Sequence, residues 1–483
     1  MKTKWGGKLN YKFGKNANQF IIIIFILLLF ISIILNNDLI LKFNFAIILL
    51  LICFILLKNN KFLLIITLFS SILSQFLVDE FNLPQVVQYI PDILALFILL
   101  KIINQVLKTK KQINNSILKY IIALLFCQIV ALILNDYSLL IFIWGCRNLY
   151  RFFIVFVGFQ YLYTNMDYSK LIKYLKVFVI FQLFVILFQS LRYSDWDYIS
   201  GFFGHSGTGL MLVYLMFIFC FFLSSYFHKK MNGYSLLLFL LIIFIPLILG
   251  SVKAAFFYIP TIIFIMFVFS PVIKKNYKTK IRNVIIISIF IPLFTLMSVT
   301  LFLKVFSSNS EFSQISQLYS LKYISSTVAS GSYNGDGNSI NRLNGVSIIN
   351  SLILDNAQKK IFGVGIGNAS PNKHTILQGN YFKIFSRLNY FWFFIPYFVL
   401  ENGFLGTSIF FIIMISLFIK CSKIYKKTEI VEEKIFLFAY QGCVISVFLT
   451  LIYNSSFNST QVGYFFWALS GLLINLENKY IKN

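Results

Sequence analysis

Long apolar segments constrain the fold of this chain more than any other feature. Fourteen runs of mostly apolar residues are separated by short polar connections, and each run is close to the roughly 20 residues that a helix needs to cross a bilayer. Because lipid offers no hydrogen-bond partners to the backbone, such segments have to form helices. We therefore predict an all-α polytopic membrane protein with about 12–14 transmembrane helices. The expected spans are 20–35, 39–57, 62–78, 86–103, 117–134, 139–163, 171–190, 207–227, 235–250, 254–272, 283–304, 404–419, 435–453 and 461–475.

The basic residues are distributed as in a membrane protein. The net charge of +26 could suggest a nucleic-acid partner, but the Lys and Arg residues gather in clusters between the apolar runs, as cytoplasmic loops do. We therefore expect no nucleic-acid partner and place both termini in the cytoplasm. The clusters are Lys2/Lys4/Lys8/Lys12/Lys15, Lys108/Lys110/Lys111, Lys274/Lys275/Lys278/Lys280/Arg282 and Lys423/Lys426/Lys427.

One long polar segment, Ser307–Arg387, interrupts the apolar pattern. Alternation of the spans from a cytoplasmic N-terminus places this segment outside the cell. The apolar stretch Leu388–Leu400 cannot be an additional span without breaking that alternation, so we expect an interfacial or re-entrant helix that ends at a Gly403 turn. The predicted organisation is an N-terminal helix bundle over 1–306, a long external loop with short helices over 307–403, and C-terminal transmembrane helices over 404–483.

Two arginines lie inside an expected span. Arg147 and Arg151 are four residues apart and so share one face of a helix. A guanidinium in the bilayer is costly unless it meets an anion or water. Two interpretations stay open: Arg147 reaches the outer surface and Arg151 pairs with a neighbouring helix, or the two arginines bind a lipid phosphate or line a cavity.

Further polar candidates lie in the short loops. Asp195-x-Asp197 follows Arg192 and could hold a metal ion, although two acids at this spacing are common in loops. His205 opens a span at the level of the lipid headgroups, as an interfacial histidine or as a base. Lys253 ends the tight turn Gly250-Ser-Val-Lys253, and so projects near the membrane surface.

The long loop carries Arg342, a short helical pattern and then Phe362-Gly-Val-Gly-Ile-Gly-Asn368, followed by His374. Because no long strand precedes the glycines, a dinucleotide-binding or phosphate-binding loop is not indicated.

In this order, the segments resemble the O-antigen ligase/polymerase family, which includes the Wzy-type polymerases and the WaaL-type ligases. The resemblance runs from about Arg147 to Phe410. The matching segments are Gly201-Phe-Phe-Gly204-His205-Ser-Gly-Thr-Gly209 at the start of a span, the Gly-Ser-x-Lys turn at Lys253, Arg342 leading a helix into the glycine motif, and Glu401-Asn-Gly403-Phe-Leu-Gly406.

The resemblance implies an enzyme of the cytoplasmic membrane that polymerises polyprenyl-diphosphate-linked oligosaccharide repeat units on its outer face. Neither a metal nor another cofactor is expected. The expected partners are the lipid-linked glycan, membrane lipid, a chain-length regulator and a flippase. The residues expected to be catalytic are Arg342, His374 and Glu401, and those expected to bind the diphosphate are Arg192, Lys253, Arg147, Arg151 and His205.

The chain departs from the family in two places. Ligases usually carry a His-Asn pair shortly before the Glu-x-Gly motif, whereas this chain has Asn389-Tyr-Phe-Trp392 there, and Lys253 stands where the family often has arginine. The missing histidine favours a repeat-unit polymerase over a ligase. A lipid-linked oligosaccharide flippase or transporter is the main alternative outside the family, and a metal-dependent glycosyltransferase using Asp195 and Asp197 is the third.

Overall fold

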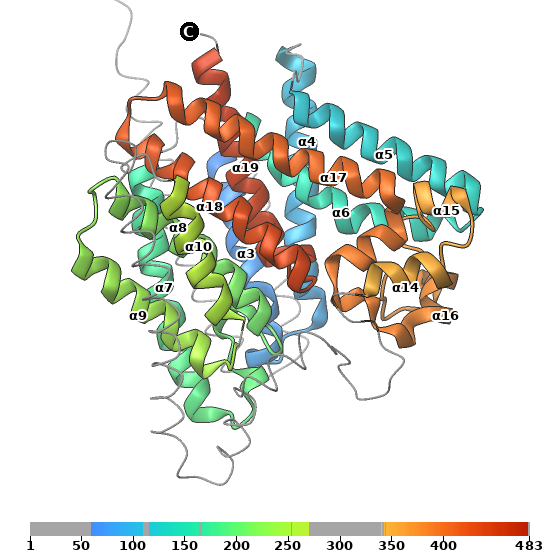
Figure 1. Cartoon of the computed structure of the whole chain (residues 1–483), viewed down its shortest axis with the longest axis horizontal. Helices are drawn as coiled ribbons and strands as arrows, with labels where there is room; N and C mark the ends of the chain where they lie inside the picture. The colour runs from blue at the N-terminus through green and yellow to red at the C-terminus, as the bar shows by residue number, and fades with distance from the viewer. Residues whose placement is uncertain are drawn as a thin grey trace, which may run out of the picture. The chain divides into compact units, whose positions relative to one another are not determined.

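The computed structural model describes residues 59–109, 115–163, 167–252, 254–269, 340, 342 and 344–481. All elements in these ranges are helices, and the ranges contain no strand. The chain divides into two units, Met1–Ile65 and Ile66–Asn483. Only the start of α3 is described in the first unit, and all other described elements belong to the second unit (Figure 1). The expected spans over 20–35, 39–57 and 283–304 lie outside the described residues.

The predicted membrane helices are found throughout the described ranges. Eight of the helices are long and apolar enough to cross a membrane, which confirms a multi-pass membrane protein. The helices α9 and α10 are shorter, and each contains a proline. The eight long helices are α3 (Asn60–Phe81), α4 (Ile90–Thr109, preceded by the short helix η1, Gln85–Tyr89), α5 (Ser116–Asn135), α6 (Leu139–Tyr161), α7 (Tyr168–Arg192), α8 (Thr208–Phe227), α17 (Phe394–Lys427) and α18 (Val431–Tyr453). The other helices at expected spans are α9 (Gly233–Leu249), α10 (Ala255–Phe269) and α19 (Thr460–Ile481).

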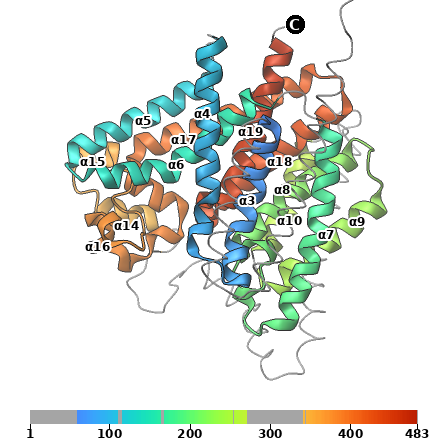
Figure 2. The same cartoon turned by 180° about the vertical axis from the view of Figure 1, so that it is seen from behind.

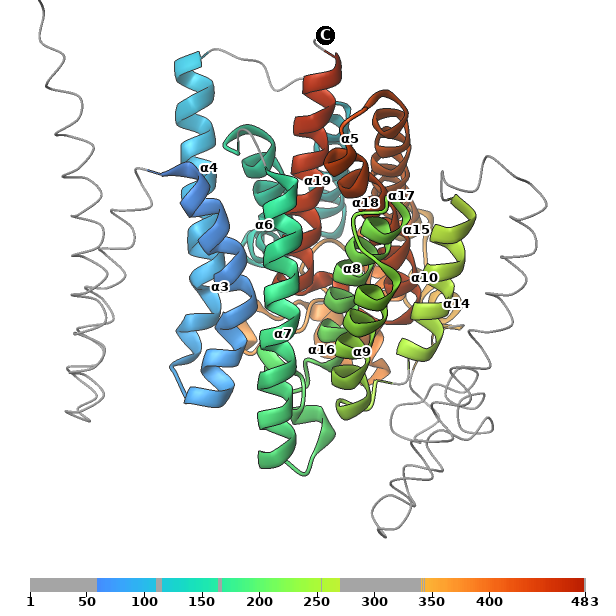
Figure 3. The same cartoon turned by 90° about the vertical axis from the view of Figure 1, so that its left-hand side faces the viewer.

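Helix α8 is buried on all sides. Its side chains from Met211 to Ser225 are almost fully covered, because α7, α9, α10, α18 and α19 pack around it (Figure 3). A helix that is apolar around its whole circumference is expected in such a position.

Small residues allow α19 to approach α6 closely. A Cβ atom on Gly471 would collide with the Phe156 carbonyl oxygen, and one on Gly463 would collide with the Phe152 ring. Glycine at a helix contact is typical of membrane bundles, where packing replaces the hydrophobic effect as the driving force. Helix α6, which makes this contact, provides one wall of the site described below.

The end of the long polar segment folds into a small helical unit, which we call the loop cap (residues 344–393). Its elements are α14 (Gly345–Leu352), α15 (Ala357–Phe362), η5 (Thr375–Leu377), α16 (Asn380–Phe385), η6 (Ser386–Leu388) and η7 (Tyr390–Trp392). The loop cap gathers beside α5, α6 and α17, on the side away from α7–α10 (Figures 1 and 2). The loop cap shares an apolar core with Ile340 and with the first part of α17; its buried residues are Ile340, Ile349, Ile353, Leu354, Val364, Ala369, Tyr390, Phe393, Val399 and Leu400.

Helix α17 consists of two helical parts joined at a kink. Gly403 has φ 64° and ψ −176°, far from helical values. The predicted turn at Gly403 is thus present, with a helix before it. That helix begins at Phe394 rather than at Leu388, because Asn389 has a left-handed φ of 55° and ends the preceding short helix η6.

Candidate functional site

The glycine motif of the loop cap lies along the kinked end of α17. The Val364 N–H donates to the Leu400 carbonyl (2.9 Å) and the Gly365 N–H donates to the Glu401 carbonyl (3.1 Å). On the other side, Gly367 touches Gly145 of α6, where a Cβ on Gly145 would lie 2.5 Å from the Gly367 nitrogen. The glycines therefore let the loop fit between two helices. They serve backbone packing, which agrees with the absence of a strand before the motif in the described ranges.

This loop surrounds the carboxylate of Glu401. Its Oε1 atom accepts hydrogen bonds from the Gly367 N–H (3.1 Å), the Ala369 N–H (3.3 Å) and the Ser370 hydroxyl (2.8 Å). Glu401 is only 3% exposed. Ser370 is also bonded to the Tyr397 hydroxyl (2.6 Å). A buried carboxylate with several donors is held in one position.

A second tyrosine, Tyr390, supports this loop from the loop cap. Its hydroxyl donates to the Ala369 carbonyl (2.8 Å). Burial raises the pKa of Tyr390, and the nearby Glu401 carboxylate raises it further. The phenol therefore stays protonated at neutral pH and remains a hydrogen-bond donor.

Glu401 lines a cavity of about 350 Å³, near the lower end of the roughly 300–1,000 Å³ typical of small-molecule sites. Its walls come from α6, the glycine-containing loop, the first part of α17, and the connection between α18 and α19. The lining residues are Gly145, Asn148, Leu149, Arg151, Ile366, Ser370, Pro371, Phe391, Tyr397, Phe398, Glu401, Asn402, Ser455, Asn458 and Ser459. Of the residues predicted from the sequence, Arg151 and Glu401 meet here.

The two arginines of α6 share a carboxylate from α4. Arg151 Nη1 lies 3.1 Å from Asp92 Oδ1, and Arg147 forms an ion pair with Asp92 Oδ2. The Tyr464 hydroxyl of α19 donates to Asp92 Oδ1 (3.1 Å). Pairing with a neighbouring helix, expected of Arg151 alone, is present for both arginines. Arg151 in addition lines the cavity.

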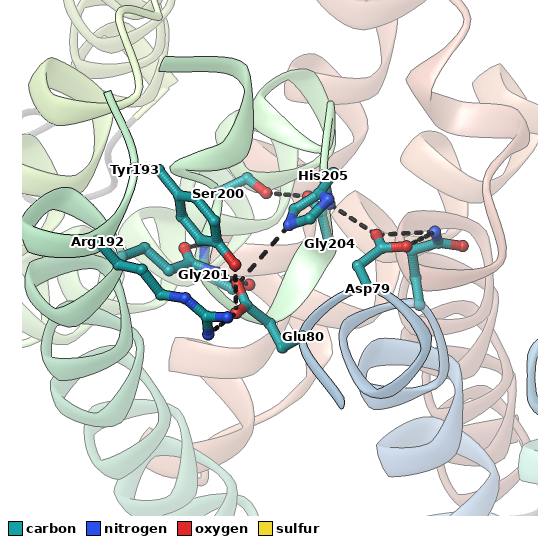
Figure 4. Close-up of polar contacts among 10 residues, drawn as sticks. Asp79, Glu80, Arg192, Tyr193, Ser200, Gly201, Gly204 and His205 are labelled. Atoms are coloured by element: carbon teal, nitrogen blue, oxygen red, sulfur yellow. Dashed lines mark hydrogen bonds and ion pairs between the residues drawn. The ribbon is translucent and has the colours of Figure 1, made fainter. Parts of the chain in front are cut away.

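Arg192 and His205 belong to a different cluster, centred on Glu80 at the end of α3 (Figure 4). Glu80 accepts hydrogen bonds from the side chains of Gln189 (2.6 Å), Tyr193 (2.9 Å) and Arg192 (3.3 Å). His205 Nε2 lies 4.0 Å from Glu80 Oε1. Neither Arg192 nor His205 is among the residues that line the cavity.

The same cluster fixes the loop between α7 and α8. The His205 backbone N–H donates to Asp79 (2.7 Å). Asp195 accepts from the Asp197 N–H (3.0 Å) and thereby caps the short helix Trp196–Tyr198. Within the described residues, no three His, Cys, Asp or Glu side chains are grouped so that they could hold a metal ion. The Asp195 carboxylate thus has a structural role as the cap of this short helix.

The remaining candidates lie elsewhere. The Arg342 Nε–H donates to the Tyr453 carbonyl (2.9 Å), and its guanidinium lies over the Tyr453 ring at 4.4 Å. Tyr453 ends α18, two residues before the cavity-lining Ser455. His374 is exposed at the start of η5 and does not line the cavity. Lys253 lies outside the described residues.

Three important residues were not predicted from the sequence, namely Asp92, Glu80 and Ser370. Glu80 lies just after the expected span 62–78, where an acid usually faces solvent, and Asp92 lies in the first half of the expected span 86–103. Arginines within a span need an anion, and the chain has only 16 acidic residues for 42 basic ones. Because so few acids are available, an acid inside another expected span is the natural partner of the two arginines.

Comparison of the chain with family models, with curated proteins and with solved structures gave no match in any of the three.

Proposed function

We propose that this chain is a membrane-embedded glycosyltransferase that polymerises polyprenyl-diphosphate-linked oligosaccharide repeat units into O-antigen, capsular or exopolysaccharide on the outer face of the cytoplasmic membrane. One observation carries the proposal: the loop cap and the membrane helices border a cavity that is lined by both the Glu401 carboxylate and the Arg151 guanidinium. The order of the motifs between Arg147 and Phe410 supports it independently.

In the proposed reaction, an acceptor sugar hydroxyl of one lipid-linked unit attacks the anomeric carbon of the growing chain. A glycosidic C–O bond forms, and the bond between the anomeric carbon and the diphosphate oxygen breaks. The polyprenyl diphosphate leaves with the bonding electrons, and the hydroxyl proton passes to a base. No nucleotide is consumed, because the diphosphate linkage supplies the driving force.

We assign Glu401 as the base. A buried carboxylate beside a bound hydroxyl is suited to remove its proton, and three donors to Oε1 keep it in position. His374 is the second candidate, although its exposed position would require the loop cap to move.

Fixed cations would stabilise the charge that develops on the leaving diphosphate. Arg342 is the strongest candidate, because its backbone partner Tyr453 lies close in sequence to the wall of the cavity. Arg192, Lys253, Arg147 and His205 remain further candidates for diphosphate binding. Arg147 and Arg192 already have carboxylate partners, which weakens the attraction that each offers to an anion.

A deletion strain tests the proposal. Its lipid-linked glycans are released by mild acid and sized on a gel, beside those of the parent strain and of the deletion strain carrying the wild-type gene. Loss of a polymerase leaves single repeat units on the lipid. An accumulated ladder of long lipid-linked chains would identify a ligase instead, and an unchanged glycan profile would refute both activities.

A further inference from the structure

The charges around the cavity are balanced. Arg151 is the one cation and Glu401 the one anion among its described lining residues. Arg151 is already paired with Asp92, which it shares with Arg147. With Glu401 ionised, these two arginines and two carboxylates carry a net charge of zero. A diphosphate, with at least two negative charges, would meet no surplus of positive charge here and would lie beside a carboxylate.

The rest of the lining combines neutral hydrogen-bonding groups with aromatic rings and the aliphatic residues Leu149, Ile366 and Pro371. Asn148, Asn402 and Asn458 offer amide donors and acceptors, and Ser455 offers a hydroxyl. Phe391 and Tyr397 provide flat apolar walls. Such a lining suits a ligand with many hydroxyl groups and apolar ring faces, which is the chemistry of a sugar.

We infer that this cavity binds an uncharged sugar residue of the acceptor glycan, and that the lipid diphosphate is bound outside the cavity, next to it. The sugar chemistry follows from the lining alone, whereas its assignment to the acceptor rests on the proposed function. The volume of about 350 Å³ accommodates a mono- or disaccharide unit. Glu401 would then select a sugar that presents a hydroxyl towards α17.

Cysteine reactivity measures the charge of the cavity without knowledge of the substrate. Ser455→Cys places a thiol on the cavity wall with little change in size, and Asn458→Cys provides a second reporter. The purified protein in nanodiscs is treated with anionic, cationic and neutral methanethiosulfonate reagents. The matched control is Ser351→Cys on the exposed face of α14, and labelling of the native cysteines in the parent protein is subtracted.

After correction by the Ser351→Cys control, the anionic and cationic reagents should modify the cavity thiol at rates within about tenfold of each other. A cavity built for a diphosphate would instead favour the anionic reagent by about 10–10³-fold. Glu401→Gln in the Ser455→Cys background should shift the ratio towards the anionic reagent, because one negative charge is removed from the wall.

Ligand protection gives the second measurement. A panel of methyl glycosides, including glucoside, galactoside and N-acetylglucosaminide, is compared with methylenediphosphonate for protection of the thiol from the neutral reagent. At least one glycoside should protect it, and the diphosphonate should not. A strong preference for the anionic reagent, protection by the diphosphonate alone, or no protection by any glycoside would each overturn the inference. Altered lipid-linked glycans in the deletion strain would still support the proposed function in that case, so the two failures are distinguishable.

Discussion

Replacement of Gly145 by alanine tests how tightly the glycine-containing loop is held between α6 and α17. A Cβ atom at this position would lie 2.5 Å from the Gly367 nitrogen and 2.7 Å from both the Gly367 Cα and the Ile366 carbonyl carbon. All three are backbone atoms, so no side chain can rotate away to make room. Either α6 or the loop has to move.

Two opposing effects decide whether Gly145→Ala stabilises or destabilises the protein. Alanine stabilises a helix by roughly 0.5–1 kcal/mol relative to glycine. Overpacking of a close contact typically costs about 1–3 kcal/mol, and the loop here has little freedom because its N–H groups are bonded to Glu401 and to the α17 backbone. We therefore expect Gly145→Ala to destabilise the protein by about 1–2 kcal/mol. Displacement of the Gly367 N–H would also loosen Glu401 and reduce glycan transfer.

The assay is the temperature at which purified protein in detergent loses its monodisperse peak in size-exclusion chromatography. Gly233→Ala is the matched control, because a Cβ there would meet only the Tyr226 ring edge, at 4.0 Å. Gly145→Ala should lose its peak at a lower temperature than the wild type, and Gly233→Ala should not. Equal or greater heat resistance of Gly145→Ala would refute the close packing of the loop on α6.

Three further predictions concern other parts of the molecule. Asp92→Asn should destabilise the protein by about 2–4 kcal/mol in the same assay, because two partly buried arginines lose their carboxylate. Burial lowers the pKa of His228 below its ordinary value of 6.5. The contribution of neutral His228 to stability should therefore be complete above about pH 6.5 and should decline as the pH falls through the lower pKa of the folded protein. His228→Gln should remove that part of the pH dependence of stability. For topology, Thr375→Cys should react with an impermeant thiol reagent in intact cells and Lys427→Cys should not; the reverse pattern would invert the orientation.

The membrane helices could be predicted from the sequence because helix formation in lipid depends only on the apolar run itself. A run such as 207–227 has to form a helix wherever it lies in the bundle, and α8 is found at Thr208–Phe227. The burial of this helix on all sides was not predicted, because apolar residues are required equally by contact with lipid and by contact with protein. Sequence patterns identify a membrane helix without identifying its neighbours.

The site could be predicted only in part, because sequence patterns do not show which segments lie next to each other. Glu401 was selected from a motif, and the structure gives it donors and a cavity. Its donor Ser370 and the arginine partner Asp92 come from segments far away in the chain, so no local spacing indicated them. The glycine motif is a weak signal by itself, and its role becomes evident only when both helices that it separates are known.

Glycan transfer between lipid-linked units in a purified system is the most direct test of a polymerase in which Glu401 is the base. Lipid-linked repeat units isolated from the deletion strain are incubated in nanodiscs with the wild-type protein, with Glu401→Gln, and with Glu477→Gln as a control whose carboxylate pairs with Lys420 away from the cavity. We expect a ladder of longer lipid-linked chains with the wild type and the control, and at least a hundredfold slower elongation with Glu401→Gln, in line with the roughly 10²–10⁴-fold contribution of a general base. Wild-type elongation by Glu401→Gln would contradict the role of the cavity, and the absence of elongation by the wild type would contradict the proposed function itself.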